Sequence, residues 1–151
     1  LFCVIYDDVN DERDEIVALD AQTLQLRHRF GLGLLNDAQT LAVGGNELYA
    51  CDTNNNRLQV FSLTGEHRRS IVGEWQSPEQ LCFAKDRLYL VEGDRGEEEE
   101  DNEGDTAVPV QRRRIIVLSL QGDILQVVTH PTEPTAVFKS VCCSDHKLLA
   151  S

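Results

Sequence analysis

The stretch CDTNNNRLQVFSLTGE, residues 51–66, decides the fold of this chain. An apolar run ends in Asp52, an asparagine-rich turn follows, and Arg57 opens a second apolar run that closes at Gly65. Short runs of this kind between turn residues predict two antiparallel strands joined by a tight turn. We expect the carboxylate of Asp52 to accept hydrogen bonds from the turn and to pair with Arg57.

The turn itself is unusually rich in one residue type, with asparagine at Asn54, Asn55 and Asn56. Asparagine tolerates the left-handed backbone that tight turns need. The acid–arginine arrangement recurs later in the chain, with Glu92 and Arg114 in the corresponding places. Recurrence is typical of a structural device, whereas a catalytic site usually occurs once. We therefore interpret these residues as structural, with a second role in shaping a binding surface at one rim of the fold.

Internal repeats extend this pattern over the chain. NELYACD (46–52) aligns with DRLYLVEGD (86–94) at a distance of 40 residues, and RLQVFSLTGE (57–66) aligns with RIIVLSLQGD (114–123) at a distance of 57. The 17-residue difference places an insertion at about residues 95–111. In the clearest copy, four short runs span residues 38–45, 47–53, 57–63 and 66–73. Four strands in about 40 residues, repeated, indicate a β-propeller blade.

The expected fold is therefore all-β, a β-propeller of four-stranded antiparallel blades in which stacked neighbours bury both faces of each sheet. We expect about three and a half blades in this chain. Their predicted pieces span about residues 1–31, 32–73, 74–130 and 131–151. TLAV, QLCF and SVCC are predicted as innermost strands, and the arginine-rich RHR and HRR runs as outermost ones. The chain starts at Leu1 and contains no methionine, so we expect a piece of a longer protein.

One family resemblance becomes specific at this point. The run LYACDTNNNRLQVFSLTGE (48–66) resembles an NHL repeat: a strand ending in Asp, an asparagine-containing turn, Arg, an apolar strand and a Gly turn. A second copy is similar, and a first is degenerate, with Glu15 in place of the arginine and Asp7 or Asp8 as its acid. The resemblance implies a propeller that closes with six blades. It also implies a domain often found downstream of a RING module in ubiquitin ligases.

Net charge argues against two classes of partner. The formal net charge is −12, and nine acids lie between residues 92 and 105 with a single arginine among them. Such a balance disfavours binding to nucleic acid or to an anionic membrane surface through bulk electrostatics. No apolar run reaches the roughly 20 residues that a membrane-spanning helix needs. We expect neither nucleic acid nor membrane as a partner.

The acidic insertion is the second candidate surface. Its densest part is Glu97, Glu98, Glu99, Glu100 and Asp101. Three acids, Glu99 among them, fall at the first, third and fifth places of an EF-hand loop, but the twelfth place holds Val110 instead of the bidentate glutamate. We favour a solvated acidic loop at a rim, open to a protein partner, over a calcium site.

Cysteines and histidines give no sign of a metal site or cofactor. The five cysteines are Cys3, Cys51, Cys82, Cys142 and Cys143. None shows CxxC spacing, so we predict buried free thiols and a cytoplasmic location. The four histidines fall at unmatched places of the repeat and are His28, His67, His130 and His146. A zinc site needs three or four converging ligands, and we predict exposed lone histidines instead.

The function that these features favour is a non-catalytic scaffold for protein–protein interaction. Recruitment of substrates for a ubiquitin ligase is one form of this role, and the family resemblance alone implies it. Two alternatives stay open: a propeller enzyme, a metal-dependent hydrolase or lyase, with its site on blades outside this chain, and an RNA-binding propeller, which the net charge disfavours.

Overall fold

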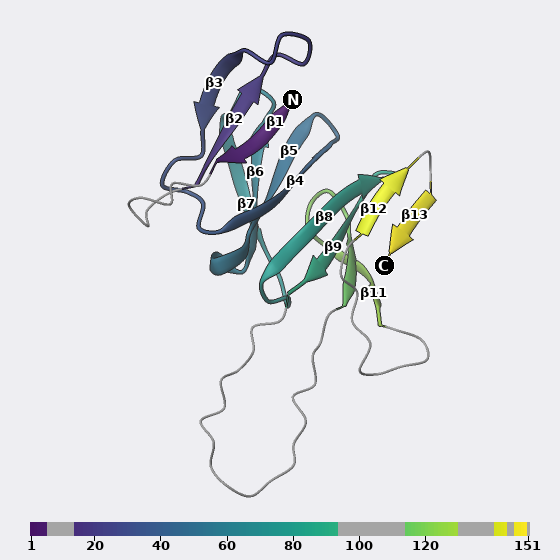
Figure 1. Cartoon of the computed structure of the whole chain (residues 1–151). Helices are drawn as coiled ribbons and strands as arrows, with labels where there is room; N and C mark the ends of the chain where they lie inside the picture. Colours follow the sequence, from purple (N-terminus) through teal and green to yellow (C-terminus); the bar gives the residue numbers. More distant parts are fainter. Residues whose placement is uncertain (6–13, 94–113, 130–140, 145–146, 151) are drawn as a thin grey trace, which may run out of the picture.

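The regular secondary structure of the described residues is antiparallel β-strand apart from one short 3-10 helix, and the strands form sheets side by side (Figure 1). A computed structural model describes residues 1–5, 14–93, 114–129, 141–144 and 147–150, with side chains as far as Val141. No helix in these residues has the length and apolar character needed to cross a bilayer.

Four sheets follow one another along the sequence. The first contains β1 (Phe2–Ile5), β2 (Glu15–Leu19) and β3 (Leu26–Phe30). The second contains β4 (Ala38–Gly44), β5 (Glu47–Asp52), β6 (Arg57–Ser62) and β7 (His67–Val72). The third contains β8 (Pro78–Ala84), β9 (Arg87–Glu92), β10 (Ile115–Leu118) and β11 (Ile124–Val128). The last pairs β12 (Val141–Ser144) with β13 (Lys147–Ala150).

The second and third sheets are four-stranded meanders in which each strand pairs with the next along the chain. All four strands of the second sheet begin and end within one residue of the predicted bounds. The predicted innermost strands β4, β8 and β12 lie next to one another, whereas β3 and β7 form outer edges. The acidic insertion predicted at about residues 95–111 lies outside the described residues, between β9 and β10 in the sequence.

Both faces of the second sheet are buried, because side chains alternate between the two sides of a strand. Along β5, Leu48 and Ala50 pack against the first sheet, in a core cluster that includes Ile16. Tyr49 and Cys51 point the other way, into a cluster shared with the third sheet. The near-continuous apolar runs of these strands are therefore a consequence of the sheets covering each other.

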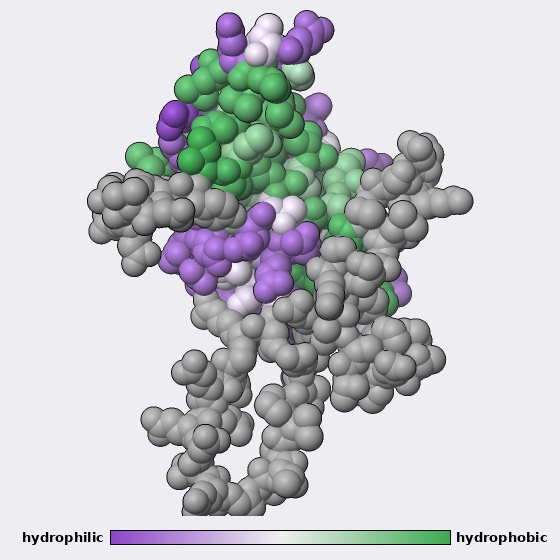
Figure 2. Space-filling view, in the orientation of Figure 1, coloured by the Kyte–Doolittle hydropathy of each residue, from purple (hydrophilic) through white to green (hydrophobic). Residues whose placement is uncertain are grey.

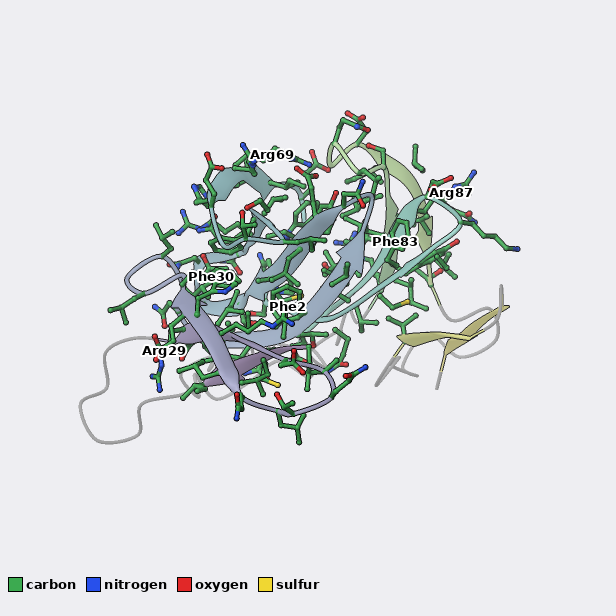
Figure 3. All side chains as sticks on the ribbon, turned by 90° about the horizontal axis from the view of Figure 1, so that it is seen from above. Phe2, Arg29, Phe30, Arg69, Phe83 and Arg87 are labelled. Atoms are coloured by element: carbon green, nitrogen blue, oxygen red, sulfur yellow. The ribbon has the colours of Figure 1, made fainter. Side chains whose placement is uncertain are left out.

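A glycine allows the inner strands to approach closely. Gly44 on β4 faces Phe83 on β8, and a Cβ atom at Gly44 would lie 2.3 Å from a carbon of that ring. Figure 3 labels Phe83 on this inner strand. The hydroxyl of Thr40, also on β4, donates to the carbonyl of Glu79 at 2.5 Å. Close contact and a hydrogen bond between β4 and β8 thus fix the second sheet against the third.

The cysteine prediction is right in part. Cys51 is a buried free thiol, and burial raises its pKa far above the ordinary value. Cys3 is also free and is half-buried. Cys82 on β8 is disulfide-bonded, so the prediction of five free thiols is wrong. Sequence spacing carries no signal for a bond that depends on how strands pack, and this bond removes the cysteine-based argument for a reducing, cytoplasmic location.

Candidate functional site

The turn after β5 is organised around the buried carboxylate of Asp52, none of which is exposed. Its Oδ1 accepts from the backbone N–H of Asn36 at 2.8 Å and from Nδ2 of Asn55 at 2.9 Å. Its Oδ2 accepts from Nε of Arg57 at 2.6 Å and from Nε2 of Gln59 at 3.2 Å. Four donors around one buried carboxylate compensate for the lost hydration of its charge. The predicted Asp52–Arg57 pair is confirmed.

The turn holds its shape through a short 3-10 helix, Thr53–Asn55, followed by one left-handed residue. Asn56 has φ 53° and ψ 39°, and its backbone N–H donates to the carbonyl of Thr53. Asn54 and Asn55 belong to the 3-10 turn and do not have positive φ. The prediction of left-handed asparagine is thus right for one of the three residues, because only the residue after the 3-10 helix has to adopt the conformation that reverses the chain.

Hydrogen bonds from this turn reach the connecting segments on both sides of the second sheet. The backbone N–H of Thr53 donates to the carbonyl of Asp37 at 3.3 Å, and its hydroxyl donates to the carbonyl of Pro78 at 2.7 Å. The backbone N–H of Ser77 donates to Oδ1 of Asn56 at 2.8 Å. The turn therefore joins the segment that precedes β4 to the one that leads into β8.

The third sheet repeats this device. Glu92, which is 3% exposed, pairs with Arg114 through both carboxylate oxygens, one of them 2.9 Å from Nη2. This contact raises the pKa of Arg114. Nη2 of Arg114 also donates to the carbonyl of Glu74 at 3.1 Å, as Nη2 of Arg57 donates to the carbonyl of Leu34 at 3.2 Å. Because the two carbonyls are one 40-residue repeat apart, the recurrence extends beyond the two charged residues.

The first sheet departs from the pattern. In its register Ile5 lies opposite Glu15, at the place that the acid–arginine pair occupies in the next sheet. Glu15 instead pairs with Arg29 on β3. Asp7 and Asp8, the predicted acids of this copy, lie outside the described residues. The degenerate first copy thus exchanges a buried turn pair for an ion pair whose arginine is largely exposed.

The exposed part of this end of the molecule is a set of amide side chains. Asn36, Asn54 and Asn55 are exposed, and Nδ2 of Asn54 donates to Oδ1 of Asn36 at 3.1 Å. We call these three residues the amide rim. Figure 2 shows hydrophilic residues gathered at the end where β5 passes into β6, below a hydrophobic upper part. The charged candidates at Glu97, Glu98, Glu99, Glu100 and Asp101 lie outside the described residues.

Sequence reasoning missed residues that complete this network. Asn36 supplies both a backbone donor to Asp52 and an exposed amide, and Gln59 is a buried amide inside an apolar strand. Gln59 also donates to the carbonyl of Leu34 at 3.1 Å and accepts from the hydroxyl of Ser70 at 2.7 Å. A polar residue two places after the arginine of an otherwise apolar run is the signal that could have indicated Gln59.

A second ionic group lies at the opposite end of the second sheet. Arg69 donates to both oxygens of Glu47, at 2.6 and 2.8 Å, and to the carbonyl of Leu120 at 2.9 Å. The hydroxyl of Tyr49 donates to Glu47 at 3.0 Å. Hydrogen bonding to Arg69 lowers the pKa of Glu47, while burial and then the Glu47 carboxylate raise the pKa of Tyr49 to about 12. In the third sheet Arg87 takes the place of Glu47 and Gln126 takes the place of Arg69, so this ion pair does not recur there.

The described histidines belong to a row of rings between the first two sheets. His28 stacks on Phe30 with centroids 5.5 Å apart, Phe30 meets Phe61 at 5.3 Å, and Phe61 meets His67 at 5.5 Å. His28 is half-buried and its Nε2 has no hydrogen-bond partner among the described residues, so the prediction of exposed histidines is wrong for His28 and right for His67. Among the described side chains, no three His, Cys, Asp or Glu residues gather closely enough to hold a metal ion.

Comparison with known proteins supports the repeat and the fold. The family model of the NHL repeat matches residues 35–61, the segment that contains Asp52, Arg57 and Gln59. A search of curated protein sequences found no match. Among solved structures, this chain is similar to a glutaminyl cyclase from Myxococcus xanthus, with TM-score 0.61 and 15% identity. That match covers 91% of this chain and 53% of the cyclase.

Two further structures show the same likeness. A hydrazine synthase from Kuenenia stuttgartiensis matches with TM-score 0.63 and 16% identity, over 90% of this chain and 35% of the synthase. The computationally designed Ika4 protein matches with TM-score 0.56 and 15% identity, over 93% of this chain and 73% of the design. These are β-propeller proteins, and the predicted all-β propeller fold is confirmed. The chain spans only 53% of the cyclase and 35% of the synthase. The closure of the propeller with six blades stays a prediction.

Proposed function

We propose that this chain, which carries an NHL repeat and has a β-propeller fold, is a non-catalytic platform to which another protein binds. The observation that carries the proposal is the amide rim. The side chains of Asn36 and Asn54 are hydrogen-bonded to each other, and that of Asn55 donates to the buried Asp52. A polar surface that is already fixed before binding loses little conformational freedom in a complex, which favours affinity.

The charged side chains at the two acid–arginine turns are engaged in structure. Asp52 and Arg57 pair with each other, as do Glu92 and Arg114, and each arginine also bonds to a backbone carbonyl. Groups saturated in this way support a surface and are poorly placed to bind substrate atoms. Recruitment of a ubiquitin-ligase substrate would be one use of such a platform, and it rests on the family resemblance alone.

An enzyme is the competing function. Two similar structures are named as enzymes, but at 15–16% identity the likeness concerns the fold. A propeller with an active site on blades outside this chain would leave the amide rim without effect on activity. The rim is therefore the place where the two functions make different predictions.

The test is a comparison of partner proteins retained by immobilised chains. The rim variant carries Asn36→Lys and Asn54→Lys, which place long cations on exposed positions and remove none of the side-chain donors to Asp52. The matched control carries Arg68→Ala on the outer strand β7, where the side chain is exposed. We expect the rim variant to lose specific proteins that the wild type and the control retain. Identical sets of retained proteins for all three chains would contradict the proposal.

A further inference from the structure

The outer edges of the first three sheets differ in a way that concerns partner binding. Strands β3, β7 and β11 are each the last strand of their sheet. The first two have the sequences LRHRF and HRRSIV, and their arginines are the usual protection of an edge strand against pairing with another chain. The third, β11, reads ILQVV and carries no charged residue. Of the described outer edges, β11 alone lacks this protection.

The side chains of β11 are also exposed. Ile124 is 43% exposed, Leu125 51% and Val127 42%, and Gln126 is exposed as well. Because neighbouring side chains point to opposite faces of a strand, apolar groups are available on both faces of this edge. Exposed apolar side chains gathered along one edge are typical of an interaction site, and single scattered ones are not.

The backbone of this edge is available too. β11 pairs antiparallel with β10, and among the described residues no strand pairs with its other side. In an antiparallel ladder, alternate residues direct their N–H and C=O groups toward the partner strand, and the others direct theirs away. An extended peptide can add to such an edge through main-chain hydrogen bonds, with side-chain contacts that select the sequence.

Charge selects the kind of partner. The segment from Ile115 to Thr129 contains one charged residue, Asp123, next to the start of β11, and the whole chain has a formal net charge of −12. Two copies of this chain therefore repel each other, whereas a positively charged segment is attracted. We propose, building on the protein-binding function above, that β11 binds an extended, apolar and positively charged segment of another protein as an added strand.

The experiment uses the whole chain and a synthetic probe. The probe is a fluorescent peptide of about ten residues that alternates valine and threonine and has lysines at both ends. One control peptide has prolines in place of the threonines, because proline cannot donate to a strand ladder. The edge variant carries Leu125→Lys and Val127→Lys, and the control variant carries Val72→Lys on β7, where the side chain is 72% exposed. Binding is followed by fluorescence anisotropy, and protection of the β11 amides by hydrogen exchange.

We expect the wild type and the Val72→Lys variant to bind the valine–threonine peptide alike and to protect β11. The edge variant should bind at least about tenfold more weakly, and the proline peptide should not bind. Equal binding by the edge variant, or no binding by the wild type, would overturn the proposal. So would a wild-type dimer in light scattering that the edge variant converts to a monomer, since a second copy would then occupy β11.

The rim variant separates this inference from the proposed function. Asn36→Lys and Asn54→Lys lie at the end of the second sheet and leave β11 unchanged. If the peptide binds the rim variant as it binds the wild type, the edge site stands whatever the partner comparison shows. If peptide binding fails while the rim variant still loses partners, the edge site falls and the platform function remains.

Discussion

Replacing Arg57 by alanine is the sharpest test of the structural role assigned to the Asp52 turn. The change removes the 2.6 Å hydrogen bond from Nε to Oδ2 of Asp52 and the 3.2 Å bond from Nη2 to the carbonyl of Leu34. It leaves the buried carboxylate with three uncharged donors, from Asn36, Asn55 and Gln59. A carboxylate with no exposed surface is then left without its only cationic partner in this network.

The expected loss of stability follows from how deeply each of the two side chains, Asp52 and Arg57, is buried. A hydrogen bond to a charged group contributes about 1.5–3 kcal/mol, and breaking a fully buried ion pair costs about 3–5 kcal/mol. The side chain of Arg57 is 32% exposed, so water can enter where the guanidinium was and can hydrate Asp52 in part. We therefore expect Arg57→Ala to lower the free energy of unfolding by about 1–3 kcal/mol, below the fully buried case.

The assay is urea denaturation followed by the fluorescence of Trp75, the chain's one tryptophan. This side chain is 2% exposed and lies in the core between the second and third sheets, so its emission reports the unfolding of both. The matched control is Arg68→Ala, which removes a 3.1 Å ion pair with Glu66 in which both side chains are largely exposed. Such surface pairs contribute about 0–1 kcal/mol.

The outcome that refutes the reasoning is a small difference between the two variants. If Arg57→Ala lowers the free energy of unfolding by no more than Arg68→Ala does, the three remaining donors already satisfy Asp52. The acid–arginine pair would then be incidental to the turn.

Three further predictions concern the insertion, a buried hydroxyl and a close turn. Replacing residues 96–107 with a short Gly-Ser linker should leave the thermal midpoint of unfolding nearly unchanged, because the repeat aligns without them, and a large drop would contradict this. The pKa of Tyr49 is raised to about 12, so the stability that depends on its neutral form is fully present below about pH 10 and is lost as the pH rises through 12. Tyr49→Phe should therefore lose less stability than the wild type between these pH values in alkaline denaturation. An equal loss in the two proteins would refute the prediction. Gly122→Ala should lower the free energy of unfolding by about 2–3 kcal/mol in urea melts, because φ is +102° and the new Cβ would lie 2.2 Å from Cγ2 of Ile71. Gly33→Ala, at φ +76° with open space around it, should lower it less. Equal losses would show that the contact with Ile71 is unimportant.

Local signals explain how much of the fold could be predicted. Alternation with period two, turn residues and a 40-residue repeat are written in short stretches of sequence, and they gave the strands of the second sheet to within one residue. The pairing of Asp52 with Arg57 was predictable for the same reason, because the two residues flank one turn and lie opposite each other in the ladder. The first sheet was harder, since Ile5 lies opposite Glu15 and the acids expected there lie outside the described residues.

The candidate site depended more on the tertiary structure. The sequence alone determined which residues form strands, where each turn falls and which charged pair closes it, because these follow from neighbours a few positions apart. Only the packing of sheet on sheet decided that Arg57 also bonds to the carbonyl of Leu34, that Cys82 is disulfide-bonded and that β11 is an exposed edge. The bond from Arg57 to Leu34, for example, joins residues 23 positions apart, and no local pattern records which side chains such packing brings together.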